Sequence, residues 1–253
     1  MSLSDRIALV TGGSRGIGEA IVRRFSAAGA TVVVCSRSAD EGIALAEELT
    51  GLSRAVVYVP CDVGSETEVR AMIAMIVDRY GRLDVLVNNA GITASGTVEE
   101  TTLDSWRAVL DANITTMFLV TKYAIPALRR SKAASIINLG STYGVVGAAG
   151  SAAYAVTKAA AINLAKTLAI ELAVDGIRVN ALCPGATATP MNIEWLAAQP
   201  DPEQALRDLV AKHPIGRMSS PDEQASAALF LASDDSSYVT GHALMADGGY
   251  TAI

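Results

Sequence analysis

The sequence predicts an α/β protein, with one doubly wound parallel sheet of about seven strands and helices on both faces. Short apolar runs alternate with longer stretches of helical periodicity, which is typical of parallel strands joined by crossover helices. Hydrophobic residues make up 51% of the composition and aromatic residues only 5%, so the apolar content is mainly Ala, Val, Ile and Leu. That mixture suits strands that are covered on both faces.

The elements follow one another with few interruptions. The apolar runs expected to form strands are residues 7–10, 31–34, 55–59, 83–87, 135–139, 177–182 and 243–246. Helical periodicity separates most of them, at 17–28, 39–50, 66–80, 103–130, 152–174 and 221–232. The one long irregular stretch is 184–221, with a helix expected near 203–211. Since no linker-like tract divides the chain, we expect a single domain over 1–253, with a substrate-side loop at about 184–221.

Composition excludes several classes of protein. The formal net charge of −6 argues against a nucleic-acid surface. The three cysteines are widely spaced without a CxxC pair, and the two histidines lack metal-ligand spacing, so we expect free thiols and no metal site. The N-terminus shows no signal pattern, and charges interrupt the most hydrophobic stretch, so we expect a cytoplasmic protein without a membrane span.

A glycine cluster follows the first predicted strand and opens the first predicted helix, in the stretch Thr11-Gly-Gly-Ser-Arg-Gly-Ile-Gly18. Glycines there let the backbone turn sharply and approach a phosphate, while the helix N-terminus faces the anion. An ordinary tight turn is the alternative, but the strand–loop–helix–strand context favours a dinucleotide. The expected cofactor contacts in this loop are Gly12, Ser14, Arg15, Gly16, Ile17 and Gly18.

The end of the second predicted strand bears on the type of dinucleotide. An NAD site usually has Asp or Glu here, to bind the ribose 2′-hydroxyl. This chain has Ser36 and Arg37, which can bind a 2′-phosphate instead, and Arg15 can approach from the other side. The alternative is that Arg37 is a surface charge engaged by Asp40 or Glu41. We therefore favour NADP(H) and leave NAD(H) open.

Tyr154 and Lys158 are four residues apart in a helical stretch, so they share one helix face. Lowering a phenol pKa from about 10 to about 7 requires roughly 4 kcal/mol. One ammonium about 4 Å away supplies around that amount at an effective dielectric near 20. Ser141 follows the strand 135–139, where open α/β sheets bind their ligands, and its hydroxyl can polarise a carbonyl oxygen. This pattern predicts proton transfer at Tyr154.

Taken together, these features resemble the short-chain dehydrogenase/reductase family over essentially the whole chain. The matching motifs are Thr11-Gly-x-x-x-Gly16-x-Gly18, Cys61-Asp62-Val63, Asn88-Asn89-Ala90-Gly91, Asn113, Ser141, Tyr154-x-x-x-Lys158 and Pro184-Gly185. The resemblance implies a Rossmann-type fold, with Tyr154 as the acid/base and Ser141 holding the substrate oxygen. It also implies that Lys158 binds the nicotinamide ribose and that Asn113 supports a water-mediated proton relay.

The resemblance extends the cofactor site along the carboxyl edge of the sheet. Asp62 is expected beside the adenine, and the stretch Pro184-Gly185-Ala-Thr187-Ala-Thr189 resembles the one that contacts the nicotinamide amide. Ordinary turns remain the alternative for Asp62, Thr187 and Thr189 individually. The contacts implied by the resemblance are Asp62, Val63, Asn89, Ala90, Gly91, Tyr154, Lys158, Pro184, Gly185, Thr187 and Thr189.

The predicted activity is interconversion of a ketone and a secondary alcohol with NADP(H). One alternative is a 3-oxoacyl-[acyl-carrier-protein] reductase, with Arg129-Arg130 meeting an acidic carrier, although two arginines at a helix end have ordinary explanations. A polyol, sugar or small-ketone reductase is equally open. A non-catalytic dinucleotide sensor would show a broken Ser–Tyr–Lys set, and a nucleotide-sugar epimerase would show different glycine spacing.

The substrate and subunit contacts are predicted more coarsely. Residues 142–149 and the loop from Met191 onward are expected to form the substrate walls. Met191, Trp195 and Leu196 are candidates for an apolar lid or for packing against another subunit. The resemblance implies a homo-oligomer, a tetramer or a dimer, formed through the helices 103–130 and 152–174.

Overall fold

The computed structural model describes residues 1–52 and 54–253. It contains a seven-stranded parallel sheet with the strand order β3-β2-β1-β4-β5-β6-β7. The strands are β1 (Ile7–Thr11), β2 (Thr31–Ser36), β3 (Val56–Pro60), β4 (Val85–Asn88), β5 (Ser135–Leu139), β6 (Arg178–Pro184) and β7 (Ala243–Ala246). The fold class predicted from the sequence is confirmed.

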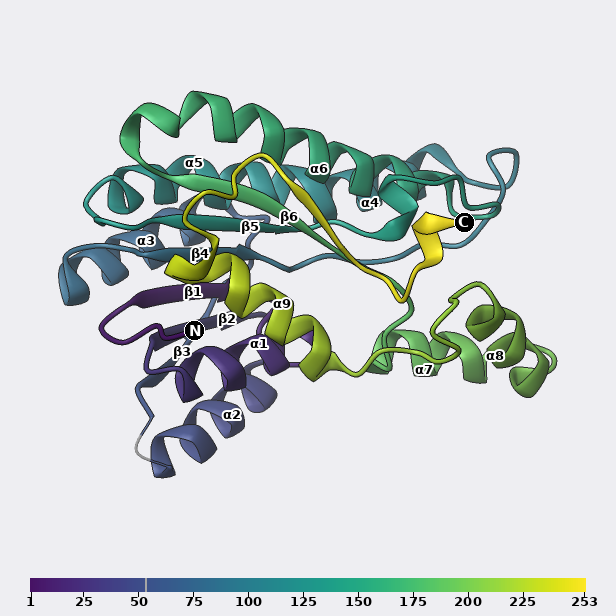
Figure 1. Cartoon of the computed structure of the whole chain (residues 1–253), viewed down its shortest axis with the longest axis horizontal. Coiled ribbons are helices and arrows are strands. Elements are labelled where there is room, and N and C mark those ends of the chain that lie inside the picture. The colour runs from purple at the N-terminus through teal and green to yellow at the C-terminus, as the bar shows by residue number, and fades with distance from the viewer. Residues whose placement is uncertain (53) are drawn as a thin grey trace.

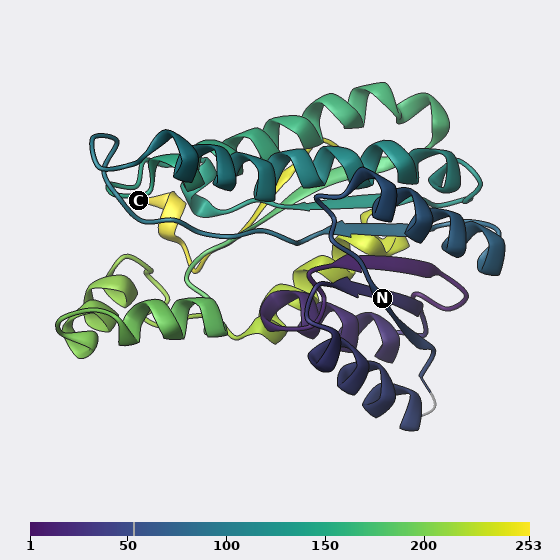
Figure 2. The same cartoon turned by 180° about the vertical axis from the view of Figure 1, so that it is seen from behind.

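Helices cover both faces of this sheet (Figure 1). One face carries α1 (Gly16–Ala27), α2 (Ala39–Gly51) and α9 (Pro221–Ala232). The other carries α3 (Glu66–Tyr80), α4 (Leu103–Leu110), α5 (Thr116–Leu128) and α6 (Ala152–Glu171), as the view from behind in Figure 2 also shows. Each face has its own apolar core, around Leu86 and Ile136 on the second face and around Val10 and Phe25 on the first.

The strand order reverses between β1 and β4, which are neighbours although β2 and β3 intervene in the sequence. The chain leaves β1 towards one edge of the sheet and returns at β4 to build towards the other edge. Crossover connections leave in opposite directions at this point, and sheets of this kind bind their ligands in a crevice at the carboxyl ends of the two strands, here β1 and β4. The glycine-rich loop and the Asn88-Asn89 turn both lie there.

Two segments differ from the sequence prediction. The helix expected over 103–130 contains a π-helical turn, η1 (Asp111–Thr115), between α4 and α5. The stretch 184–221 is also less irregular than expected, because it contains α7 (Pro190–Ala197) as well as α8 (Pro202–Ala211) near the predicted position. Thr189 accepts a hydrogen bond as the N-cap of α7, and Pro190 follows it at the first helical position, a start signal that the prediction overlooked.

Both helices of this excursion project beyond the end of the sheet, as Figure 1 shows.

Within the described ranges, no helix combines the length and the apolar character needed to cross a membrane.

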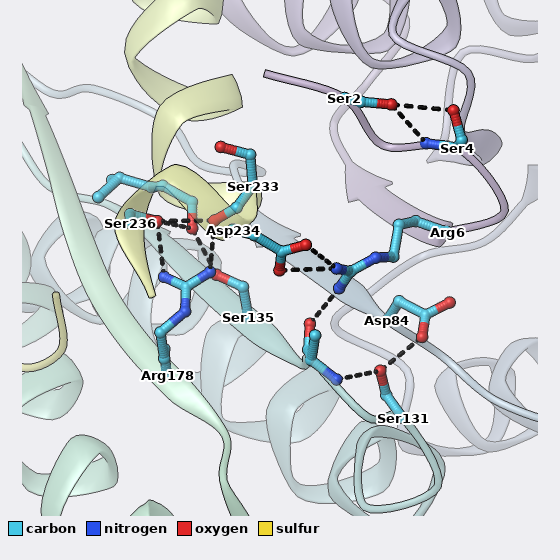
Figure 3. Close-up of polar contacts among 12 residues, drawn as sticks. Ser2, Ser4, Arg6, Asp84, Ser131, Ser135, Arg178, Ser233, Asp234 and Ser236 are labelled. Carbon is cyan, nitrogen blue, oxygen red and sulfur yellow. Dashed lines mark hydrogen bonds and ion pairs between the residues drawn. The ribbon is translucent and has the colours of Figure 1, made fainter. Parts of the chain in front are cut away.

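A polar network closes the amino end of the sheet (Figure 3). Arg6 donates to both carboxylate oxygens of Asp234, at 2.8 and 3.0 Å, and thereby joins the start of β1 to the segment after α9. Arg178 donates to the Ser236 hydroxyl at 2.8 Å. Asp84 is buried and accepts hydrogen bonds from the Ile7 backbone N–H at 2.8 Å and from a serine hydroxyl of the segment before β5. These contacts hold together the amino end of the sheet, opposite the carboxyl ends where the glycine-rich loop lies.

We expect Asp84→Ala to lower the free energy of unfolding by about 1–3 kcal/mol, because the Ile7 N–H loses its buried acceptor. Urea unfolding followed by circular dichroism measures this change. Asp104→Ala is the matched control, since the Asp104 side chain is 97% exposed and its partner lies 4.0 Å away. Equal stability of the two variants would contradict the structural role of Asp84.

Candidate active site

The carboxyl ends of β1 and β4 are joined through Thr11 and Asn89. The Thr11 hydroxyl oxygen accepts from the backbone N–H groups of Asn89 and Ala90, at 3.0 and 3.1 Å. The Asn89 side-chain amide donates to the carbonyls of Thr11 and Gly12, both at 2.9 Å. The glycine-rich loop and the Asn-Asn-Ala-Gly turn therefore form one hydrogen-bonded unit.

The glycines of this loop lie where a side chain has no room. A Cβ on Gly12 would lie 2.9 Å from the Ala90 Cα, and a Cβ on Gly18 would overlap the Gly12 carbonyl oxygen. Gly12 and Gly16 also adopt a φ of 60°, in the left-handed region. Such a tight turn exposes backbone N–H groups at the start of α1, where Arg15 makes no side-chain cap. These residues fit a dinucleotide phosphate.

The excursion approaches the same loop. A Cβ on Gly16 would lie 3.5 Å from the Thr189 methyl group, so the Gly-rich loop and the start of α7 lie close together. Two of the predicted cofactor segments, far apart in the sequence, thus border one space.

The predicted adenosine end is formed by the residues after β2. Ser36 donates to the Ser38 carbonyl at 3.2 Å, and Arg37 is exposed. Across the described residues Arg37 forms no ion pair, so the alternative interpretation, its engagement by Asp40 or Glu41, is not observed. Glu41 instead accepts a hydrogen bond from the Ser14 hydroxyl, at 3.2 Å. The sequence prediction did not foresee a carboxylate at the glycine loop.

Asp62 lies after β3 at the same edge of the sheet. It is exposed, and its Oδ1 accepts from the Gly64 backbone N–H at 2.9 Å. That bond forms a turn of the kind that aspartate often makes with the residue two positions ahead. Val63, next to it, packs against the core beneath β2 and β3.

The three candidate catalytic side chains come from two adjacent elements. Ser141 directly follows β5, and Tyr154 and Lys158 lie one turn apart on α6. The Lys158 ammonium donates to the Leu139 carbonyl at 2.8 Å and lies 5.4 Å from the centroid of the Tyr154 ring. Gly144 holds the two elements together, because a Cβ there would lie 2.7 Å from the Lys158 carbonyl. Absence of a side chain lets the turn after Ser141 rest directly on α6.

Burial governs the ionisation of this pair. It raises the pKa of Tyr154 to about 12, opposed by the Ser141 side chain, and lowers the pKa of Lys158 to about 8. The lowered phenol pKa expected from one ammonium is therefore not found in the protein alone. The cost of desolvating a phenolate outweighs the attraction, and the Lys158 nitrogen is directed at Leu139. Tyr154 accordingly holds its proton and is ready to donate it.

Asn113 lies in the π-helical turn η1, a helix distortion that often marks a functional position. Its side-chain oxygen accepts from the Ile92 N–H at 2.7 Å, and its amide donates to the Ile92 carbonyl at 2.9 Å and to the Thr157 hydroxyl at 3.0 Å. Thr157 in turn donates to the Tyr154 carbonyl at 2.7 Å. The side chain thus holds the loop after β4 against α6, at the turn that carries Tyr154.

The Pro184–Thr189 stretch follows β6. Gly185 donates its N–H to the Ala246 carbonyl at 3.2 Å, which continues the pairing with β7. Thr187 is buried, with its hydroxyl 2.9 Å from that of Ser219, and Thr189 caps α7. Both threonine hydroxyls therefore have structural partners, as the ordinary-turn alternative expects.

A chain of aromatic contacts runs from Tyr154 through Tyr143 and Tyr250 to His213, and we call the last three side chains the aromatic wall. The Tyr143 ring meets the Tyr154 ring edge-on, with centroids 6.4 Å apart, and lies 6.4 Å from the Tyr250 ring. His213 stacks on Tyr250 at 5.1 Å. Tyr143 falls within the predicted substrate wall, but no sequence pattern links it to the other two.

Comparison with known proteins agrees with this geometry. A family model described as Enoyl-(Acyl carrier protein) reductase matches residues 12–251. An L-fucose dehydrogenase of Oryctolagus cuniculus is 42% identical over 97% of this chain and 85% of its own length. The 3-oxoacyl-[acyl-carrier-protein] reductase FabG of Thermotoga maritima is 38% identical over 98% and 99%, and oxidoreductase UcpA of Salmonella typhimurium is 40% identical over 98% and 95%.

The chain belongs to the short-chain dehydrogenase/reductase family. It is therefore an oxidoreductase that acts on CH–OH or carbonyl groups of a small molecule, and the family implies a nicotinamide dinucleotide cofactor. The glycine cradle described above fits such a group.

The buried ammonium of this short-chain dehydrogenase/reductase leads to a stability prediction. Because burial lowers the Lys158 pKa from 10.5 to about 8, the folded state binds this proton less tightly than the unfolded state. The charge therefore destabilises the fold below pH 8, and that cost disappears as the pH rises towards 10.5. We expect Lys158→Met to be more stable than the parent at about pH 7, with the difference shrinking by about pH 10.

Urea unfolding at both pH values measures this difference. Lys166→Met is the matched control, because Lys166 lies on the same helix and is exposed. A stability difference for Lys158→Met that does not change with pH would contradict the buried, destabilised ammonium.

Proposed function

We propose that this protein interconverts a ketone and a secondary alcohol with NADP(H), and that Tyr154 is the general acid/base. The observation that supports this most is the grouping at the carboxyl end of β5, where the protonated Tyr154 phenol lies beside Ser141 and Lys158. The proposal treats residues 1–253 as one nucleotide-binding domain, with 184–221 as its substrate-side segment.

Each member of this group has a distinct task. The bound dinucleotide supplies the hydride for the carbonyl carbon or accepts it from the alcohol. Ser141 donates a hydrogen bond to the substrate oxygen, and Tyr154 transfers a proton to that oxygen during reduction. Lys158 stabilises the phenolate that remains, and its lowered pKa keeps its own proton labile near neutral pH. Asn113 supports the relay that reprotonates Tyr154, by resemblance to the family.

The cofactor would lie along the carboxyl edge of the sheet. Its phosphates would contact the loop from Gly12 to Gly18 and its nicotinamide the stretch from Pro184 to Thr189. Tyr154 and Lys158 would bind the nicotinamide ribose, and Asn89, Ala90 and Gly91 would border it. Asp62 and Val63 would border the adenine.

The preference for NADP(H) is supported by the exposed Arg37, which forms no ion pair within the described ranges, and by Ser36. Arg15, at the start of α1, adds a second cation. Glu41 disfavours NADP(H), because its carboxylate is hydrogen-bonded to Ser14 and would repel a 2′-phosphate bound nearby. We therefore expect NADP(H) to be preferred, with NAD(H) accepted less well.

Arg37→Asp tests this preference. The substitution removes a charge-assisted donor and adds a repelling carboxylate, so the ratio of kcat/KM for NADPH to that for NADH should fall about tenfold or more. Arg79→Asp makes the same charge change on an exposed position of α3 and should leave the ratio unchanged. If Arg37→Asp leaves the ratio at the parental value, Arg37 does not read the 2′-phosphate.

The substrate proposal remains a ketone, polyol or sugar, since the L-fucose dehydrogenases are among the relatives. A 3-oxoacyl-[acyl-carrier-protein] reductase is the alternative, supported by the relative from Thermotoga maritima. Its predicted carrier contact receives no support, because Arg129 pairs with Asp175 at 2.8 Å and Arg130 donates to the Gly81 carbonyl. Both arginines lie just beyond α5, before β5 begins, at the amino end of the sheet.

Exposed apolar side chains mark two further surfaces. Met191 and Trp195 on α7 are 39% and 37% exposed, which suits a lid over the substrate or a contact with another subunit. Phe118 on α5 and Ile170 on α6 are 52% and 79% exposed, and they support our expectation of a homo-oligomer.

Tyr154→Phe tests the catalytic proposal. Removing the only group assigned to proton transfer should lower kcat about a hundredfold or more, while the dissociation constant for NADPH stays within about threefold. NADPH oxidation with ketones and an acetoacetyl thioester, together with NADP+ reduction with L-fucose-type sugars, measures turnover, and fluorescence titration measures binding. Tyr143→Phe, which removes a neighbouring hydroxyl, is the control. Unimpaired turnover of Tyr154→Phe would overturn the assignment.

A further inference from the structure

His213 contacts three parts of the chain that are far apart in the sequence, namely α8, the segment after β6 and Tyr250 near the C-terminus. The residue is 6% exposed and lies two positions beyond the end of α8. Its Nδ1 lies 2.9 Å from the Leu209 carbonyl oxygen on α8, and its Nε2 lies 3.0 Å from the Ala186 backbone nitrogen. Its ring stacks on Tyr250 near the C-terminus, at an interplanar angle of 25°.

The two partners determine the state of the imidazole. The Leu209 carbonyl can only accept, so Nδ1 carries a proton and donates it. The Ala186 N–H can only donate, so Nε2 presents a lone pair. The neutral ring with its proton on Nδ1 satisfies both contacts, and no other state does.

The segment held by Nε2 has little freedom on either side. A Cβ on Gly185 would lie 2.9 Å from Nε2 and 2.9 Å from the Asp247 Cα, so the backbone rests against the imidazole. On the other side, Ser219 donates its N–H to the Ala186 carbonyl at 2.9 Å and accepts from the Ala188 N–H at 2.9 Å. His213 therefore fixes one side of the segment from Gly185 to Ala188, and the two backbone hydrogen bonds with Ser219 fix the other side.

We propose that His213 is a positioning residue that couples the docking of α8 to the backbone at Gly185–Thr187 and, through Tyr250 and Tyr143, to Tyr154. This inference rests on the proposed function, in which that backbone segment contacts the nicotinamide. One rigid ring makes all the contacts, so α8 cannot shift without disturbing the bond to Ala186. Catalytic geometry is sensitive to such shifts, since a displacement of about 1 Å can cost about a hundredfold in rate.

Two conservative substitutions each retain one of the two hydrogen bonds of the imidazole and remove the other. His213→Gln places an amide oxygen near the position of Nε2 and retains an acceptor for Ala186. His213→Asn places an amide N–H near the position of Nδ1 and retains a donor for Leu209. His213→Phe retains the ring on Tyr250 and loses both bonds. His242→Gln is the control, because His242 is exposed and outside these contacts.

Steady-state kinetics and hydrogen–deuterium exchange of the full-length variants test the proposal. We expect His213→Asn and His213→Phe to lose about tenfold or more in kcat, with the dissociation constant for NADPH within about threefold, while His213→Gln retains most of the turnover. Amide exchange should accelerate in peptides that contain Ala186 for the Asn variant, and in peptides from 202–211 for the Gln variant.

Parental kcat in His213→Asn, or the same exchange pattern in the Asn and Gln variants, would overturn the coupling. The exchange pattern does not depend on turnover. If Tyr154→Phe remained active while the exchange pattern held, the proposed function would fail and the structural coupling through His213 would stand.

Discussion

The hydrogen bonds between Thr11 and Asn89 are the contact on which the rest of the site depends. The parallel sheet brings the carboxyl ends of β1 and β4 together at the reversal of strand order, and these two side chains lock the loops that follow. Because these loops pack so closely, a side chain at Gly12 or Gly18 has no room. The candidate phosphate site at the start of α1 is therefore formed by backbone atoms. A binding surface of backbone N–H groups suits an anionic phosphate.

Desolvation determines the protonation of the candidate catalytic group. Close packing of the turn after Ser141 against α6 buries Lys158 and partly buries Tyr154, so the phenol keeps its proton and the ammonium holds its proton weakly. A protonated phenol beside a hydroxyl donor is suited to delivering a proton to a carbonyl oxygen. The same burial works against stability, since a charged amine in this position is held by one carbonyl. The proposed function and the stability of the fold therefore make opposite demands on Lys158.

The excursion that carries α7 and α8 is attached to the body of the protein by few but specific contacts. Thr189 lies close to the glycine loop, the Thr187 hydroxyl is hydrogen-bonded to that of Ser219, and His213 accepts a hydrogen bond from the segment after β6. Apolar side chains on α7 remain exposed, and they are the surface that the proposed lid or subunit contact would use.

Local patterns in the sequence were sufficient for the architecture and for most candidate residues. Alternating apolar runs predict the sheet, because strand and helix periodicities are properties of neighbouring residues, and glycines and asparagines predict the turns at the strand ends. The position of Asn113 in a helix and the shared face of Tyr154 and Lys158 follow from the same local geometry. Neighbouring residues also signal the start of α7, since Thr189 is its N-cap and Pro190 its first residue, although the prediction treated the segment as a loop.

Contacts between distant residues were decided only by the tertiary structure. Glu41 reaches Ser14 and His213 reaches Ala186, each across 27 positions, and no periodicity encodes either meeting. The Tyr154 pKa is of the same kind, because desolvation depends on everything that packs around the ring, whereas sequence spacing discloses only the neighbouring charge. The sequence by itself thus determined which groups line the carboxyl edge of the sheet, and the packing of the folded chain decided their protonation and partners.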